Sequence, residues 1–412
     1  MRTKVLLLTT VLCLGHAPVS FGETLLQIYD MALQSDPVLR EAAERRLASQ
    51  ETRPQALANL LPNLNAVGSY DYIDERTDSP IAGVRDQTYT QNALSGQLNQ
   101  VLYNRGFWMQ LKQADDVIAQ ADAQYKNAQI DLMVRTTAAY LNVLRAADNV
   151  NVTKAELRAN ERQLDQSKQR FEVGLVAITD VNESQAAYDR ARADVISAEN
   201  ALNNRWEELR QIIGNVSVPL ARLGDKLPLT PPEPNDIAKW AETAARQNYG
   251  IIAAQDAAEV AQKTIEIQRS GHYPRLDLVA SYGISRTGSE IGADVDRGVV
   301  GVELNLPLYQ GGAVSSRTRQ AGYDYQAALE VLDQTRREVN RNVKDAFRGI
   351  LSSISEVKAR KAALVSAQSA WESTEAGLEV GTRTQVDVLN AQQRLYDEER
   401  FYLSSRYDYI LN

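Results

Sequence analysis

The 412-residue sequence contains few of the side chains on which most enzymes and metal sites depend. It has two histidines, His16 and His272, and a single cysteine, Cys13. A cluster of His and Cys ligands, or a nucleophile activated by histidine, cannot be assembled from so few groups. We therefore expect no catalytic residue, no metal and no cofactor, and we expect His272 to be a packed or interfacial residue.

The net charge argues against a nucleic-acid-binding protein, and the short apolar stretches argue against membrane-spanning helices. The formal net charge of -8 makes a polyanion such as nucleic acid an unsuitable partner. Beyond the N-terminal segment, no apolar stretch reaches the roughly 20 residues that a membrane-spanning helix needs. Any insertion into a membrane must therefore use strands.

Residues 1–22 have the pattern of a secretory signal peptide. Two basic residues precede the apolar run Val5–Leu14, which is too short to span a bilayer. The small residues Ser20 and Gly22 then stand before a predicted cut at Glu23. The mature chain is therefore expected to be exported and to contain no thiol.

The remaining sequence repeats one pattern at an offset near half its length. The motif Glu172-Val173-Gly174 recurs as Glu379-Val380-Gly381. An offset of this size indicates tandem duplication of a large unit, because solenoids repeat every 20 to 50 residues. Two repeats are predicted, at 23–225 and 226–412.

Each repeat is expected to contain a helix, two strands, a long helix and a returning helix. The expected helices are 24–61, 106–173 and 180–213, then 235–271, 312–379 and 386–412. The expected strands are 64–73, 88–103, 276–286 and 298–309. Apolar and polar residues alternate through Leu276–Ile284, which is typical of a barrel wall with one face in lipid. Polar loops are expected between the paired strands, at 74–87 and 287–297.

The long helices should form coiled-coil hairpins. The segment 106–173 has no proline and would reach roughly 100 Å as a helix, with apolar residues recurring every seven. Gly174 suits the end of this helix, and Thr179 with Asp180 suits the start of the next. The counterpart of Ile213 in the second repeat would fall beyond Asn412, which predicts a sequence truncated at its C-terminus.

Four strands cannot close a membrane barrel, because the smallest closed barrels have about eight. Several chains must therefore share one barrel, and three chains supply twelve strands. The sequence predicts an α+β membrane protein with a long coiled-coil α-barrel and a shared 12-stranded β-barrel in a trimer.

Three segments, 163–182, 304–312 and 380–389, resemble signature stretches of the TolC family of outer-membrane efflux channels. The resemblance extends over essentially the whole mature sequence. It implies a homotrimer in outer-membrane lipid, with helices that extend into the periplasm. It also implies docking to a periplasmic adaptor protein and to an inner-membrane efflux pump or ABC transporter, for drug efflux and type I protein secretion.

The resemblance also implies a periplasmic entrance with an acidic constriction. Asp387 matches the constriction-lining position, whereas the second acidic position of the family is occupied by Asn390. Arg383, with Thr179 and Asp180, matches a polar latch between neighbouring hairpins. A tyrosine of that latch is replaced by Leu378. Read without the resemblance, Asp180 and Asp387 favour helix N-termini by charge–dipole attraction, and Arg383 is a solvated surface charge.

Two further sets of residues are expected at the ends of the long helices. The hairpin turns, which should contact the adaptor, comprise Val173, Gly174, Leu175, Val380, Gly381 and Thr382. The hinges between strands and helices comprise Pro62, Pro274, Pro307, Gly311 and Gly312.

Two other functions remain open at this point. A structural periplasmic coiled-coil protein would explain the heptads, but it would not explain the duplicated tyrosine-rich hairpins. A passive diffusion porin would explain the strands, but it would not explain helices of roughly 100 Å.

Overall fold

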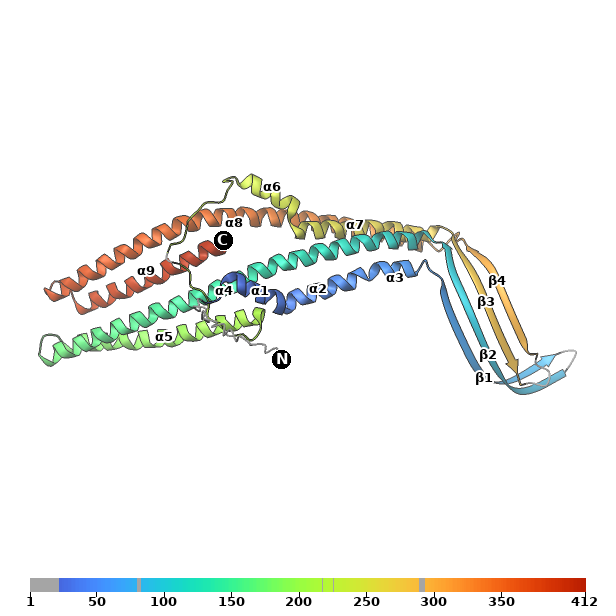
Figure 1. Cartoon of the computed structure of the whole chain (residues 1–412), viewed down its shortest axis with the longest axis horizontal. Coiled ribbons are helices and arrows are strands. Elements are labelled where there is room, and N and C mark those ends of the chain that lie inside the picture. Colours follow the sequence, from blue (N-terminus) through green and yellow to red (C-terminus); the bar gives the residue numbers. More distant parts are fainter. Residues whose placement is uncertain (1–21, 80–82, 217, 225, 289–292) are drawn as a thin grey trace, which may run out of the picture. The chain divides into compact units, whose positions relative to one another are not determined.

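The computed structural model describes residues 22–79, 83–216, 218–224, 226–288 and 293–412. Nearly all of the predicted signal peptide therefore lies outside the described residues. The fold is α+β, with long helices and one antiparallel sheet (Figure 1). The described chain divides into two compact units. Within the described residues, unit 1 comprises 22–36, 132–230 and 352–412, and unit 2 comprises 37–131 and 231–351.

Nine α-helices and four strands are found among the described residues. The helices are α1 Leu25–Ser35, α2 Pro37–Gln50, α3 Thr52–Ala58, α4 Arg105–Glu172, α5 Ile178–Ile213, α6 Ile237–Gln247, α7 Tyr249–Arg269, α8 Ala313–Glu379 and α9 Gln385–Leu411. The strands are β1 Asn63–Ser79, β2 Gly83–Tyr103, β3 Arg275–Thr287 and β4 Val295–Asn305. A short 3-10 helix, η1 Ser270–His272, follows α7. No described helix has the length and apolar character required to cross a membrane.

The helix before each pair of strands is broken. Pro37 and Pro54 predict interruptions in the expected helix 24–61, and the structure divides it into α1, α2 and α3, whereas the break in the expected helix 235–271 has no proline to predict it. Pro37 begins α2 after a break at Asp36, because proline is tolerated in the first turn of a helix but not in its interior. In the second repeat, Asn248 ends α6 and begins α7. The Asn248 side chain accepts hydrogen bonds from the backbone N–H groups of Gly250 and Ile251, which otherwise have no partner in the helix.

The sheet lies in unit 2 and has the order β1-β2-β3-β4. Its central pair joins the two halves of the sequence, since β2 pairs antiparallel with β3 from Gln91↔Thr287 to Val101↔Asp277, before a bulge. Within the described residues, β1 pairs only with β2 and β4 pairs only with β3. The outer edges of β1 and β4 therefore have no strand partner in the described chain.

The hairpin of β1 and β2 is longer than the sequence predicts. The ladder continues from Asn63↔Asn99 to Ser79↔Gly83, so most of the expected loop 74–87 is strand. Cross-strand polar pairs support this extension: Arg76 lies 3.7 Å from Asp86, and Thr88 donates to Asp74 at 3.2 Å. Polar residues indicated a loop, but they can also pair across a ribbon that is solvated on both faces.

The prediction that a strand continues to residue 309 is also wrong, because β4 ends at Asn305. Pro307 follows, and proline has no N–H group to donate to a ladder. Of the other expected loop, residues 289–292 lie outside the described part of the chain.

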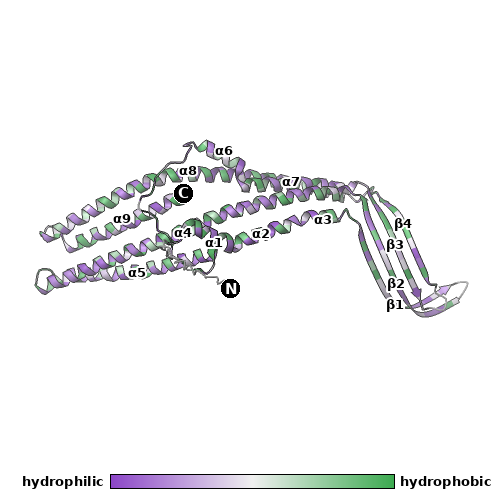
Figure 2. Ribbon diagram, viewed as in Figure 1, coloured by the Kyte–Doolittle hydropathy of each residue, from purple (hydrophilic) through white to green (hydrophobic). Residues whose placement is uncertain are grey.

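The two faces of the sheet differ in polarity, as the alternating colours along the strands show (Figure 2). The register places these residues on one face: Leu64, Tyr70, Tyr72, Leu94, Leu98, Leu278, Tyr282, Ile284, Val300, Val302 and Leu304. The other face carries Asn65, Ser69, Gln91, Ser95, Gln97, Asn99, Asp277, Ser281, Ser285, Arg297 and Glu303. The apolar face is uncovered, with Val300 79% exposed and Leu64 75% exposed.

Unit 2 also contains the first part of α4, which makes polar contacts with α2 and α7. Arg46 of α2 donates to Asp122 of α4, and the amide of Gln113 donates to the carbonyl of Val260 at 2.7 Å. Arg105 forms an ion pair of 2.7 Å with Glu266. These contacts hold α2 and α7 against α4, and the Arg105–Glu266 pair lies next to the strand junction.

The core of unit 1 forms where α1 meets the middle of α4 and the C-terminal end of α5. Ile28, Leu132, Leu209 and Ile213 are almost completely buried there. Tyr140 donates its hydroxyl to the carbonyl of Ala221 at 2.7 Å, which connects α4 to the segment after α5. Burial of each such side chain contributes about 1.5 to 3 kcal/mol to folding.

Candidate functional site: the hairpin tips and the strand–helix junction

Both helical hairpins of unit 1 turn through the same backbone motif. Gly174 has φ of 74° and Gly381 has φ of 77°, which is the left-handed conformation that glycine adopts without steric cost. The Leu175 N–H donates to the carbonyl of Arg170 at 2.8 Å, and the Thr382 N–H donates to that of Gly377 at 2.8 Å. This pattern is a Schellman motif, which satisfies the last carbonyl groups of α4 and α8.

The returning helix α9 begins with a capping box. Thr384 accepts a hydrogen bond from the Asp387 N–H at 3.2 Å. In return, the Asp387 carboxylate accepts from the backbone N–H and the hydroxyl of Thr384, each at 2.9 Å. The reciprocal bonds fix the side chain of Asp387 against the turn and pair amide groups that the helix leaves free.

The first hairpin starts its returning helix differently from the prediction. Helix α5 begins at Ile178, and its N-cap residue is Ala177, which has no side-chain oxygen to offer. Thr179 is therefore already inside the helix, and Asp180 lies in its first turn without a capping side-chain partner. The expected Thr-Asp cap at this turn is wrong, because the chain becomes helical one residue before Thr179.

The pKa of the Asp387 carboxyl is lowered from its usual value of 3.8. The largest cause is the hydrogen bond from the Thr384 backbone, followed by the bond from its hydroxyl and by the positive charge of Arg383. Each of these interactions favours the ionised carboxylate. The group therefore stays negatively charged throughout the physiological pH range.

The α4–α5 turn and the α8–α9 turn, which carry the predicted latch residues, lie at the same end of unit 1 (Figure 1). Arg383 is exposed, and its side chain lies over Gly377, where an added Cβ would approach the Arg383 Cγ to 2.7 Å. Leu378 is half-buried and accepts the N–H of Gly381 at 3.2 Å through its carbonyl. None of the hydrogen bonds and ion pairs described for this chain joins Arg383 to Thr179 or Asp180.

Asp387 and Asn390 lie in two different grooves of unit 1. Asp387 shares a cavity of about 550 Å³ with Arg383 and Arg394, along α8 and α9. Asn390 lines a smaller cavity of about 200 Å³ between α9 and the first hairpin, beside Glu156. Within one chain, therefore, the two residues do not face a common space.

The turns also expose apolar side chains. Leu175 is 74% exposed and Val380 is 75% exposed, and Val173 is similarly open. Gly174, Gly381 and Thr382 are exposed beside them. The tips therefore present small apolar surfaces that the described chain does not cover.

A set of buried polar contacts between the hairpins was not predicted. Gln385, the first residue of α9, donates to Ser184 of α5 at 3.2 Å, and Ser184 bonds with Ser167 of α4 at 3.0 Å. In the sequence, these contacts are indicated only by polar residues at positions where the heptad pattern predicts a buried side chain. The partners lie 201 residues apart in the sequence, so no local rule connects them.

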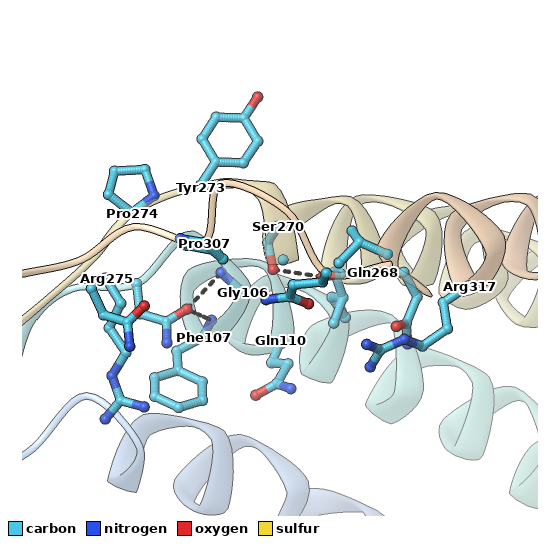
Figure 3. A pocket seen from close by; sticks show the side chains of 16 residues that line it. Gly106, Phe107, Gln110, Gln268, Ser270, Tyr273, Pro274, Arg275, Pro307 and Arg317 are labelled. Carbon is cyan, nitrogen blue, oxygen red and sulfur yellow. Dashed lines mark hydrogen bonds between the residues drawn. The ribbon is translucent and has the colours of Figure 1, made fainter. Parts of the chain in front are cut away.

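The second part of the site is a cavity of about 490 Å³ at the junction of strands and helices in unit 2 (Figure 3). Pro274 and Pro307 line it, together with Tyr273 and Arg275. Asn104, which also lines the cavity, directly precedes α4, and its side chain accepts hydrogen bonds from the backbone N–H groups of Gly106 and Phe107 at 2.9 and 3.3 Å.

The predicted hinge residues all lie at such junctions. Pro62 directly precedes β1 and Pro274 directly precedes β3. Gly311 and Gly312 precede α8 with φ of 61° and 81°, a conformation that β-branched or bulky residues avoid. The described residues contain no group of three or more His, Cys, Asp or Glu side chains in a metal-binding arrangement.

The chain matches the family described as outer membrane efflux protein, over residues 28–215 and 240–411. It is 39% identical to outer membrane protein TolC of Vibrio cholerae over 95% of this chain and 89% of that protein. It is 29% identical to the proteases secretion protein PrtF of Dickeya chrysanthemi, over 100% of this chain and 90% of that protein. The crystal structure of outer membrane protein VceC from Vibrio cholerae has the same fold, with a TM-score of 0.78, 20% identity, and coverage of 94% and 93%.

The chain therefore belongs to the outer membrane efflux protein family. It is a TolC-like efflux channel of the outer membrane, and not an enzyme. Family membership decides against the structural coiled-coil protein and the passive porin.

Alanine substitution should have opposite effects on stability at Gly381, which has a positive φ, and at Gly322, which lies inside a helix. Replacing Gly381 by alanine forces a side chain into positive φ, at a cost of roughly 1 to 2 kcal/mol. Gly322 lies within α8 with open space around it, so Gly322→Ala should stabilise the chain by up to about 1 kcal/mol. Thermal unfolding followed by circular dichroism should therefore move in opposite directions for the two variants. A Gly381→Ala protein as stable as the parent would contradict the Schellman turn.

The capping box predicts a pH dependence at the tip. A carboxyl whose pKa is lowered on folding stabilises the folded state above its usual pKa, and this stabilisation is lost as pH falls through the lowered value. Asp387→Asn removes the charge but keeps an oxygen acceptor. Hydrogen exchange of the 380–390 segment should therefore be faster in the variant than in the parent near neutral pH. The difference should vanish in acid below the lowered pKa, and a difference that persists there would contradict the assignment.

Proposed function

We propose that three copies of this chain form the outer-membrane exit channel of a tripartite export system. The three four-stranded sheets together close one 12-stranded β-barrel, and the long helices of the three copies form the periplasmic duct. The hairpin tips form its entrance, with Arg383 holding it closed and the Asp387 carboxylate binding the cations that block it.

The observation that carries this proposal is the open sheet. Its apolar face is uncovered, and within the described residues β1 and β4 each leave one edge without a strand partner. In hydrocarbon each unpaired backbone group costs several kcal/mol, so the edges of one copy need the edges of another. The polar face would then line the lumen, and the apolar face would contact lipid.

Transport through such a channel needs partners that supply energy. A periplasmic adaptor protein could dock on the exposed turns, where binding would remove the apolar side chains of Leu175 and Val380 from water. The adaptor would connect the channel to an inner-membrane efflux pump or an ABC transporter. The relative named a proteases secretion protein supports type I protein secretion in addition to export of drugs and other small molecules.

A pair of adjacent substitutions tests the barrel. Val300 lies on the apolar face opposite Ala280, whereas Val299 lies on the polar face opposite Ser281. A lysine at a lipid-facing position near the bilayer midplane costs about 2 to 4 kcal/mol, while a lumen-facing lysine stays in water. Val300→Lys should therefore lower the amount of cross-linked trimer in the outer-membrane fraction several-fold, and Val299→Lys should leave it near the parent level.

The outcome is read from chemical cross-linking of intact membranes followed by electrophoresis. Equal effects of the two lysines would contradict the assignment of faces. Cross-linked species no larger than a dimer in the parent would contradict the shared barrel itself.

The entrance is tested by conductance. If Arg383 contacts Thr179 or Asp180 of a neighbouring copy, Arg383→Ser should raise the single-channel conductance in planar bilayers. Asp387→Asn should leave the conductance near the parent value and weaken block by divalent or trivalent cations, because it removes only the charge. Arg394→Ser is the matched control, since Arg394 lines the same groove but lies further from the turn. Parental conductance and block in both entrance variants, with trimers intact, would sink the site assignment.

A further inference from the structure

The two hairpins of unit 1 are joined near their tips by buried, uncharged side chains. Ser167 of α4 and Ser184 of α5 share a hydrogen bond of 3.0 Å, and Gln385 of α9 donates its amide to Ser184 at 3.2 Å. The exposed fractions of the three residues are only 3%, 0% and 6%. Gln385 directly follows Thr384, which caps α9, so the contact sits at the first residue of the returning helix.

A second contact of the same kind lies two turns further along α9. Gln392 donates its amide to Asn160 of α4 at 2.8 Å, and both residues are buried. Gln385 and Gln392 are seven residues apart, so they lie on the same face of the helix. Val388 is fully buried between them. The seam between α9 and the first hairpin therefore combines apolar packing with two amide contacts.

Separation of this seam has a specific cost. A buried amide or hydroxyl that loses its partner has no water molecule to bond to instead. The free-energy cost therefore exceeds that of a hydrogen bond broken in water. The bonds carry no net charge, so salt does not screen them as it screens an exposed ion pair. This distinguishes the contact from the exposed Arg383.

We propose that Ser167, Ser184 and Gln385, supported by Asn160 and Gln392, form a clasp within one chain that restrains the periplasmic entrance. The clasp holds the start of α9 against α4 and α5, so the second hairpin cannot move away from the first until these bonds break. The inference rests on the proposed function, because it takes the hairpin tips to be the entrance. Gln385 and Ser184 are positioning residues and do not contact the exported substrate.

The clasp is tested first by the accessibility of the seam. The only cysteine of the sequence lies in the predicted signal peptide, so Val388→Cys introduces a single thiol in the mature chain. Ser184→Ala removes the acceptor of the Gln385 amide with little change of volume. We expect it to raise the rate of maleimide labelling at Val388→Cys by roughly tenfold, the equivalent of one buried hydrogen bond. Ser197→Ala, at an exposed serine of α5, should leave the rate unchanged.

Two further variants separate the clasp from a general loosening of the fold. Labelling of Ala198→Cys, buried elsewhere on α5, should be the same with and without Ser184→Ala. Addition of Gln385→Leu to Ser184→Ala should lower the labelling of Val388→Cys again, because no amide is then left unpaired. Parental labelling in the Ser184→Ala protein, or equal rises at both reporters, would overturn the clasp.

Conductance of the full chain in planar bilayers then tests the restraint. Ser184→Ala should raise the conductance at both low and high salt, in the same membranes in which Arg383→Ser is measured. If Arg383→Ser raises the conductance and Ser184→Ala does not, the clasp does not restrain the entrance and this inference fails alone. If neither variant changes the conductance, the tips are not the entrance, and the proposed site fails together with the inference.

Discussion

The pairing of backbone hydrogen bonds in the four-stranded sheet is the constraint on which the rest of this protein depends. Three antiparallel ladders satisfy the inner strands, and β2 with β3 joins the two halves of the sequence. The outer edges of β1 and β4 have no strand partner among the described residues, and the apolar face is uncovered. In lipid such a sheet is satisfied only when further copies continue it. The channel is therefore a property of the assembly, although each ladder of the sheet is encoded in one chain.

The two hairpins of unit 1 share a turn but differ at the start of the returning helix. Both end their long helix with a left-handed glycine in a Schellman motif. Only the second then starts with a capping box, in which Thr384 and Asp387 pair reciprocally, whereas the first starts at Ala177 without a side-chain cap. The second hairpin therefore combines an ordered carboxylate with the buried amide of Gln385. Duplication supplied one architecture twice, and the second copy carries both the capping box and the amide that bonds with Ser184.

The helices and turns were predictable because their rules are local. Absence of proline over 106–173 and the glycines at 174 and 381 locate the hairpins within a residue or two of where α4, α5, α8 and α9 end or begin. The break between α6 and α7 was missed, because it depends on the single capping residue Asn248. A capping residue predicts a helix boundary less strongly than proline does. The strand ends were less predictable: Asp74 and Glu75 indicated a loop, and only the partners across the ribbon show that they belong to a strand.

By itself the sequence determined the element types, the duplicated order, the resemblance to the efflux family and the residues at the turns. Each of these depends on neighbours within a few positions, where backbone conformation and periodicity decide the outcome. Tertiary structure alone decided that β2 pairs with β3, that Asp387 and Asn390 face separate grooves, and that Gln385 reaches Ser184 across 201 residues. These contacts depend on how distant segments pack, and a buried polar residue reveals its purpose only when its partner is in place.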